Sequence, residues 1–260
     1  MAVLRPRKKL AASARLAREL GMEPVCASPI EPFFLRGPEV DKVLQELFEG
    51  EPKVVVFTSS TGVEAFQALV RDPADTLSGV EVVAIGRPTA QALEGIGVRA
   101  SFVPERYSSE GLVAGMPPDL VDGREVRLLR SDHGSQTLLS GLEERGARVR
   151  DVSLYELHGN MDRDLESLIR SALEGEVDAL PFTSSLSARA FVDAAASMSS
   201  RARVGEMLRR SLVGAIGPPT WRTLEELGAG EVVVPEEATF RSLLLELRDR
   251  FQNRFENRTD

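Results

Sequence analysis

Cysteine, histidine and aromatic residues are scarce in this chain of 260 residues, and each scarcity narrows the class of protein. The single cysteine, Cys26, excludes an intrachain disulfide framework and a cysteine-cluster metal site. It also agrees with a reducing compartment such as the cytoplasm. The two histidines, His133 and His158, have no ligand spacing around them, which argues against a zinc site. Aromatic residues make up 5% of the chain, so the core must be aliphatic.

Long apolar runs and an excess of positive charge are absent as well. No run approaches the roughly 20 residues that a membrane span needs. The chain has 32 basic and 40 acidic residues, a net charge of −8, which argues against nucleic acid and anionic membranes as partners. The first 18 residues are basic and resemble a transit peptide. Because the repeat described next includes them, we predict instead a strand at Ala2–Leu4 followed by a basic helix.

A duplicated pattern organises the chain. FTSSTGVEAF begins at Phe57 and FTSSLSARAF at Phe182, an offset of 125 residues. AIGRPTAQALEGIG begins at Ala84 and AIGPPTWRTLEELG at Ala215, an offset of 131. Two further pairs of segments keep these offsets, Val103 with Val234 and Val3 with Leu128. Four matches in the same order indicate a duplicated unit of about half the chain.

Each repeated segment begins with a short apolar run, continues through a turn of Thr, Ser, Gly and Pro, and ends in an amphipathic stretch. The runs are predicted strands buried on both faces. They are Val54–Phe57, Val82–Ile85, Val126–Leu129, Ala179–Phe182 and Val213–Ile216. Strands that alternate with helices imply parallel sheets with right-handed crossovers. We therefore predict two similar open α/β domains, a number that the chain length allows.

The turns that follow the predicted strands offer hydrogen-bond donors. Ligands of open parallel sheets bind outside the carboxyl ends of the strands, and a helix N-terminus with small hydroxyl side chains can hold an anion. The candidate residues are Thr58, Ser59, Ser60, Gly86, Thr89, Thr183, Ser184, Gly217 and Thr220. The alternative interpretation is simple helix capping, since Ser and Thr are the usual caps. Because equivalent turns occur in both repeats, we give anion binding and helix capping equal weight.

Arginines and tyrosines near these turns are further candidates. An arginine can bind a carboxylate through two hydrogen bonds. Arg5 and Arg130 are favoured because both follow a strand in equivalent repeats, although either could be a solvated surface charge. Tyr155, one of two tyrosines, is predicted either to pack at a hinge or to present its phenol to a cleft between domains. Tyr107 has a weaker case for the same role.

In their order and spacing, these segments resemble the uroporphyrinogen-III synthase family along essentially the whole chain. The resemblance rests on FTSSTGVEAF, AIGRPTAQALEGIGV, VPERYSSEGLV, FTSSLSARAF and above all AIGPPTWRTLEELGAGEVVVPEEATFRSLL. It implies an α/β fold of two flavodoxin-like domains with parallel sheets, joined by a two-stranded extended linker. The first domain would comprise residues 1–29 and 158–260 and the second, inserted domain residues 38–149. Residues 30–37 and 150–157 would be the bridging strands.

The resemblance also implies a reaction. The linear tetrapyrrole hydroxymethylbilane would be closed to uroporphyrinogen III with inversion of pyrrole ring D and loss of water, without a cofactor or metal. Tyr155 matches the family tyrosine proposed to assist departure of the hydroxyl group. Six residues match positions in the family's binding turns: Thr58, Ser59, Thr89, Ser184, Gly217 and Thr220. Donor-rich turns would meet the acetate and propionate groups of the substrate despite the charge of −8.

Two other functions remain open at this stage. One is a non-catalytic relative of the same fold that binds a tetrapyrrole and regulates a partner, against which the lack of an attached DNA-binding or signalling domain argues. The other is a two-domain binder of sugars or nucleotides, which would explain the repeat but not the set of motifs. We therefore expect a monomeric, cytoplasmic lyase whose partner is a small linear tetrapyrrole rather than nucleic acid or a membrane.

Overall fold

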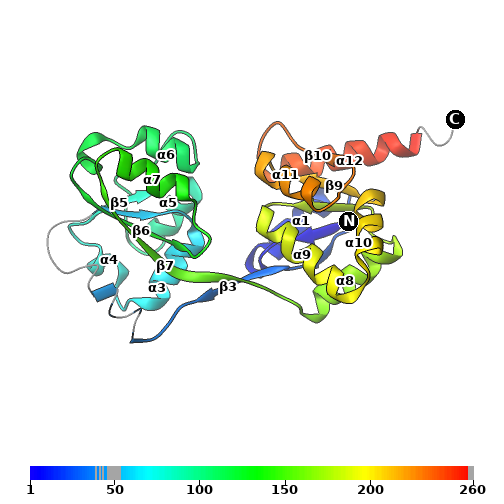
Figure 1. The fold of residues 1–260 in the computed structure, drawn as a ribbon, viewed down its shortest axis with the longest axis horizontal. Helices are drawn as coiled ribbons and strands as arrows, with labels where there is room; N and C mark the ends of the chain where they lie inside the picture. Colours follow the sequence, from blue (N-terminus) through cyan, green and yellow to red (C-terminus); the bar gives the residue numbers. More distant parts are fainter. Residues whose placement is uncertain (39, 41, 43, 46–53, 257–260) are drawn as a thin grey trace. The chain divides into compact units, whose positions relative to one another are not determined.

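The computed structural model describes residues 1–38, 40, 42, 44, 45 and 54–256 (Figure 1). The chain divides into two compact units. Unit 1 contains Met1–Glu31 and His158–Asp260, and unit 2 contains Pro32–Leu157. The chain therefore passes twice from one unit to the other, and both chain ends belong to unit 1. Within the described residues, no helix has the length and apolarity that crossing a membrane requires.

Unit 1 is built on parallel strands. β1 (Ala2–Leu4) pairs with β2 (Val25–Ala27). β9 (Leu212–Ala215) pairs on one side with β8 (Ala179–Phe182) and on the other with β10 (Val232–Val233). Because β1 also lies beside β8, the strand order across the unit is β2-β1-β8-β9-β10. Counted along the chain this order is 2-1-3-4-5, one of the two common orders of doubly wound folds.

Helices cover both faces of the strands of unit 1, because successive side chains of a strand point to opposite faces. Leu4 of β1 belongs to a core that also contains Leu168 and Phe191. Its neighbour Val3 belongs to a separate core that contains Ala17 and Leu244. The helices of the first core are α8 (Arg163–Glu174), α9 (Ser185–Met198), α10 (Arg201–Arg210) and α11 (Pro218–Glu226), and those of the second are α1 (Arg7–Glu19) and α12 (Phe240–Glu256).

Unit 2 carries a five-stranded sheet in the order β3-β7-β6-β4-β5. The strands are β3 (Ile30–Phe34), β4 (Val54–Phe57), β5 (Glu81–Ala84), β6 (Glu125–Ser131) and β7 (Arg148–Gly159). The pairs β7–β6, β6–β4 and β4–β5 are parallel. The prediction of an α/β protein with parallel sheets is therefore confirmed.

The helices of unit 2 also lie on both faces of the sheet (Figure 1). Phe57 of β4 packs in one core with Phe66 and Leu93, whereas its neighbour Val56 packs in a second core with Leu112 and Leu138. The helices of the first core are α3 (Ser60–Leu69) and α5 (Arg87–Glu94), and those of the second are α6 (Ser109–Gly115) and α7 (Gln136–Glu144). Unit 2 also contains two short elements, α4 (Pro73–Thr76) and the 3-10 helix η1 (Pro118–Leu120).

β3 and β7 carry the two passages of the chain between the units. The Leu35 amide donates to the Leu154 carbonyl oxygen and the Asn160 amide to that of Pro29, so the two strands run antiparallel. The segment 150–157, which we predicted as a bridge, is part of β7, and its residues as far as Tyr155, except Leu154, are paired with β6. For most of its length this segment therefore belongs to the sheet of unit 2.

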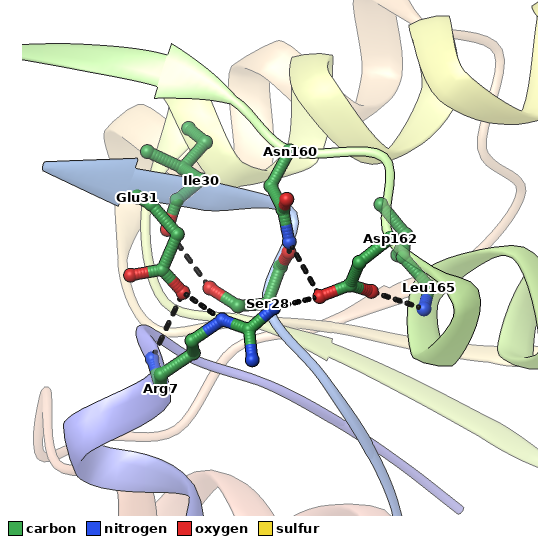
Figure 2. A network of polar contacts seen from close by, with 7 residues as sticks. All are labelled: Arg7, Ser28, Ile30, Glu31, Asn160, Asp162 and Leu165. Atoms are coloured by element: carbon green, nitrogen blue, oxygen red, sulfur yellow. Dashed lines mark hydrogen bonds and ion pairs between the residues drawn. The ribbon is translucent and has the colours of Figure 1, made fainter. Parts of the chain in front are cut away.

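Polar contacts in unit 1 hold the chain where β3 begins and β7 ends (Figure 2). The Asn160 side-chain amide donates to the Ser28 carbonyl oxygen and to the Asp162 carboxylate, at 2.9 Å in each case. Arg7, at the start of α1, forms ion pairs with Asp162 and with Glu31 of β3. α1 is thereby tied to both segments that lead towards unit 2.

The repeat in the sequence is also a repeat of strand register. The pair Val3–Cys26 in unit 1 corresponds to Leu128–Asp151 in unit 2. In the same way, Phe57–Ala84 in unit 2 corresponds to Phe182–Ala215 in unit 1, and Val83–Phe102 corresponds to Gly214–Val233. In each of these three comparisons, the residue numbers of the second pair exceed those of the first by 125 or 131. These are the offsets of the repeated motifs. β6, β7, β4 and β5 of unit 2 therefore correspond to β1, β2, β8 and β9 of unit 1.

Candidate functional site

Tyr155 and Ser59 come together in unit 2 at the carboxyl end of β4. Ser59 is the N-cap of α3, and its hydroxyl accepts a hydrogen bond from the Gly62 amide at 2.9 Å. The Tyr155 phenol oxygen lies 2.9 Å from the same Ser59 hydroxyl oxygen. Ser59 thus has the capping role, while its part in binding a ligand stays a prediction. The contact links the N-terminus of a helix to a buried phenol on β7.

An irregularity in strand pairing directs the tyrosine towards Ser59. β6 and β7 pair in step as far as Arg130 with Ser153, and the next pair is Ser131 with Tyr155. One residue of β7, Leu154, is therefore extra, as in a β-bulge. In a regular strand Leu154 and Tyr155 would point to opposite faces, yet both pack in the core beneath α3. The bulge turns Tyr155 onto the face that carries Ser59.

The surroundings of Tyr155 keep its phenol protonated. The residue is 5% exposed, and burial raises the pKa of the phenol above its ordinary value. Hydrogen bonds from Ser59 and Ser131 partly offset this effect, whereas the negative charge of Asp132 adds to it. Phe34 packs edge-on against the ring, with 6.5 Å between ring centroids. Tyr155 is therefore a neutral hydrogen-bonding group in a mostly apolar setting.

The other hydroxyl residues predicted from the sequence lie in equivalent turns of the two units. Thr58 follows β4 and Ser60 opens α3. In unit 1, Thr183 follows β8, and the exposed Ser184 caps α9 by accepting from the Ser187 amide at 3.1 Å. The residue of unit 1 that corresponds to Tyr155 under the offset of 125 is an isoleucine, residue 30. The phenol is thus a feature of unit 2 alone.

The two glycine turns are alike in backbone conformation but differ in what surrounds them. Gly86 begins α5 and Gly217 begins α11, both with an extended backbone that any residue can adopt. A Cβ atom added to Gly86 would lie 3.0 Å from side-chain atoms of Tyr107, which packs over this turn. A Cβ atom added to Gly217 would meet nothing within 4 Å. Neither packing nor backbone conformation therefore explains glycine at 217.

Thr89 and Thr220 occupy the first turns of α5 and α11. Each is 3% exposed. Within the part of the chain that the structure describes, neither hydroxyl has a hydrogen-bond partner. By contrast, the Thr223 hydroxyl in the next turn of α11 donates to the Pro219 carbonyl oxygen at 3.2 Å. Thr89 and Thr220 are therefore the threonines of these turns whose hydroxyl groups remain available to a ligand.

Arg130, a candidate substrate contact in the sequence, is instead paired within the protein and is not a solvated surface charge. Its side chain is 1% exposed and makes a two-pronged ion pair with Asp151, at 2.7 Å from Nε and 2.6 Å from Nη2. Its Nη1 donates to the Ser135 carbonyl oxygen at 2.6 Å. All three nitrogens are engaged by the protein, because β7 places a carboxylate directly beside the end of β6. We therefore leave Arg130 out of the proposed substrate contacts.

Sequence reasoning missed two features of the site. It did not pair Tyr155 with Ser59, because that contact depends on the bulge in β7, and no sequence motif predicts the bulge. It also missed Asp151 as the partner of Arg130. The register of the repeat places Asp151 on the strand beside β6, close to Arg130. The corresponding residue of unit 1 is Cys26, which cannot form an ion pair, so the repeat did not indicate one.

Comparisons with known proteins agree with this architecture. A family model described as Uroporphyrinogen-III synthase HemD matches residues 11–244. A provisionally named uroporphyrinogen-III synthase of Methanothermobacter thermautotrophicus is 33% identical over 251 residues, which cover 95% of this chain and 96% of the relative. The uroporphyrinogen-III synthase of Chlorobaculum parvum is 27% identical over 241 residues, with 90% and 92% covered.

A crystal structure of a mutant uroporphyrinogen III synthase from Thermus thermophilus shares the fold. Its TM-score is 0.62 at 22% identity, over 96% of this chain and all of that one. Parallel strands alternating with helices in two units define the class as an α/β protein with parallel sheets. The family match and the archaeal relative extend over most of the sequence, and this chain belongs to the uroporphyrinogen-III synthase family.

Proposed function

We propose that this protein cyclises hydroxymethylbilane to uroporphyrinogen III, with inversion of pyrrole ring D and loss of water. The observation that carries the proposal is the hydrogen bond between Tyr155 and Ser59 at a strand-end turn of a chain in this family. A phenol held at such a turn is a proton donor in the region where open parallel sheets bind their ligands.

In the first step Tyr155 would assist departure of the hydroxyl group. Ser59 accepts from the Gly62 amide, so its own proton is free to point at the Tyr155 oxygen. The phenol proton is then available for the departing hydroxyl oxygen. As the carbon–oxygen bond breaks, the pyrrole that carries the hydroxymethyl group supplies electrons from its nitrogen and becomes a protonated azafulvene. The phenol proton leaves with the hydroxyl group as water, and the phenolate left on Tyr155 balances the charge of the azafulvene. Because Tyr155 is 5% exposed, substrate binding in this proposal includes a small displacement of the side chains that cover it.

The raised pKa of Tyr155 means that the phenol is neutral and can donate a proton or hydrogen bond, although it also makes the phenol a weaker acid than an exposed tyrosine. Burial keeps the phenol neutral near neutral pH, and hydrogen bonds from Ser59 and Ser131 would support the oxygen as it gives up its proton. General acids of this kind contribute about 10²- to 10⁴-fold to a rate. The following steps, attack by the substituted carbon of ring D, fragmentation of the spiro intermediate and reclosure, depend mainly on holding the chain in one geometry.

The strand-end turns would hold the substrate through its carboxylates. Gly217 leaves space beside the backbone at the start of α11, although Pro218 and Pro219, the first two residues of the helix, have no N–H group to donate. The unpartnered hydroxyls of Thr89 and Thr220 add donors in the two units. Local donors of this kind allow an anion to bind to a protein whose net charge is −8.

Product analysis tests the proposal. The purified protein is incubated with freshly prepared hydroxymethylbilane, and the products are oxidised and separated as porphyrin isomers. We expect isomer III to be the main product when the protein is present. A parallel reaction without protein should give isomer I. Isomer I alone, with binding of a tetrapyrrole still detectable, would contradict the proposal and favour a non-catalytic relative.

A further inference from the structure

Arg5 is the counterpart of Arg130, but it lacks the carboxylate partner. The register places Val3 opposite Cys26 in unit 1 and Leu128 opposite Asp151 in unit 2, so Cys26 corresponds to Asp151. Burial raises the pKa of the Cys26 thiol, which keeps it uncharged near neutral pH. Unit 1 therefore has an arginine at the end of β1 and a neutral side chain where unit 2 supplies the compensating charge.

The guanidinium of Arg5 is held in place without a hydrogen-bond acceptor. It stacks over the ring of Phe240, with Cζ 4.7 Å from the ring centroid. Its Nε atom is shielded from solvent and has no hydrogen-bond partner among the described residues. Burial lowers the pKa of Arg5. The pKa of Lys9 is also lowered, first by burial and then by the nearby positive charges of Arg5 and Lys8. Arg5 and Lys9 are therefore close enough at the start of α1 for their positive charges to act on each other.

Unit 1 has a second unsatisfied group, but it lies on the other face of the strands, on the α9 side, whereas Arg5 stacks on Phe240 of the opposite core. Ser187 is 7% exposed, and its hydroxyl is another buried side-chain atom without a partner in the described part of the chain. Its counterpart in unit 2 is Gly62, where an added Cβ atom would lie 3.3 Å from the Leu129 carbonyl oxygen at the end of β6. Since β6 corresponds to β1, the repeat puts Ser187 near the Leu4 backbone on the α9 face, so Ser187 is not a neighbour of the Arg5 guanidinium. Leaving the shielded Nε of Arg5 unpaired is costly, and a ligand oxygen at the guanidinium would relieve that cost.

We propose that Arg5 is the carboxylate-binding group of unit 1 and takes one acetate or propionate of a polycarboxylate tetrapyrrole. This assignment rests on the proposed function for the class of ligand. A planar guanidinium is suited to a carboxylate because it can donate two parallel hydrogen bonds. β1 lies beside β8, so Arg5 shares an edge of the unit with the Thr183–Ser184 turn. Unit 1 thus supplies a charged contact for the substrate, whereas unit 2 supplies the phenol.

The test measures binding of uroporphyrin III, the oxidised and stable octacarboxylate, by quenching of the single tryptophan, Trp221 in α11. Arg5→Gln removes the charge with little change in size. Arg170→Gln, at an exposed position of α8, is the matched control, with the same loss of charge in the same unit. We expect Arg5→Gln to weaken binding at least tenfold, Arg170→Gln less than twofold, and Arg5→Lys to fall between Arg5→Gln and the wild type.

The outcomes separate this inference from the proposed function. An Arg5→Gln affinity within twofold of the wild type, or a wild type that does not bind uroporphyrin III, would overturn the subsite. If Arg5→Gln does not fold, as judged by circular dichroism, Arg5→Lys replaces it, and an unchanged affinity would then overturn the assignment. A wild type that fails to convert hydroxymethylbilane, but binds uroporphyrin III in an Arg5-dependent way, would contradict the reaction and leave the subsite standing.

Discussion

The hydroxyl groups of Tyr155 and Ser59 lie 2.9 Å apart although 96 residues separate them in the sequence. The serine belongs to the turn after β4 and the tyrosine to β7, and the extra residue in β7 brings the phenol to the correct face of the sheet. This contact turns two separate sequence candidates into one hydrogen-bonded pair. The chemistry that we propose depends on that pair.

Ser59→Ala should reduce both stability and turnover. Loss of a serine N-cap costs about 0.5–2 kcal/mol of stability. Loss of the hydrogen bond to the phenol, worth about 0.5–1.5 kcal/mol, corresponds to a further fall in rate of about 2- to 10-fold. Urea unfolding and initial rates of hydroxymethylbilane consumption measure the two effects.

Ser108→Ala is the matched control for this variant. Ser108 caps α6 of the same unit by accepting from the Gly111 amide at 3.0 Å, and no phenol contacts its hydroxyl. We expect a comparable loss of stability with an unchanged rate per folded molecule. Equal rates for the Ser59→Ala and Ser108→Ala proteins would reduce Ser59 to a cap.

Tyr155 should make stability fall at alkaline pH. Its pKa is raised in the folded state, so the folded protein holds the phenol proton more tightly than the unfolded chain does. The corresponding stability is fully present below the ordinary tyrosine pKa of about 10 and is lost as the pH rises towards the higher folded value. Free energies of unfolding between pH 8 and 11 should therefore decline more steeply for the wild type than for Tyr155→Phe. Parallel curves would show that the phenol is not perturbed.

Gly217→Ala should impair binding without harming the fold. Its backbone conformation suits alanine, and the new methyl group would meet no protein atom within 4 Å. Stability should stay within about 1 kcal/mol, since a stiffer unfolded chain offsets a poorer N-cap. If a ligand approaches this backbone, affinity for uroporphyrin III should fall by about tenfold, roughly 1.4 kcal/mol.

Gly86→Ala provides a contrast to Gly217→Ala, because there the methyl group would press on Tyr107 of the protein itself. We expect a lower melting temperature for Gly86→Ala, in proportion to how far Tyr107 resists displacement. An unchanged affinity for uroporphyrin III in Gly217→Ala, measured alongside it, would remove the open turn of α11 from the proposed site.

Much of the fold could be predicted from the sequence because the duplication repeats both motifs and pairing. The apolar runs Val54–Phe57 and Ala179–Phe182 coincide with β4 and β8, since strands buried on both faces are continuously apolar. The offsets of the motifs are the offsets of the strand register. Local composition determined these elements, so sequence patterns were enough to find them.

The site could be predicted only in part, because side-chain partners depend on contacts between distant segments. Ser59 and Ser184 were recognised as strand-end hydroxyls, and both are N-caps. Arg5 and Arg130 looked alike in the sequence, and only the neighbouring strand distinguishes them, with Cys26 beside one and Asp151 beside the other. Whether an arginine is free to bind a substrate therefore depends on its neighbours in the folded chain.

Replacing the phenol of Tyr155 tests the central claim most directly. Tyr155→Phe keeps the ring that packs against Phe34 and removes the hydroxyl that contacts Ser59. The measurement is the initial rate of hydroxymethylbilane conversion, with isomer analysis of the oxidised products, for variant and wild type side by side. We expect a measurable slowing of about 10²-fold or less, with isomer III still formed, because many contacts set the orientation of ring D. Conversion at the wild-type rate under substrate-limited conditions would contradict the account.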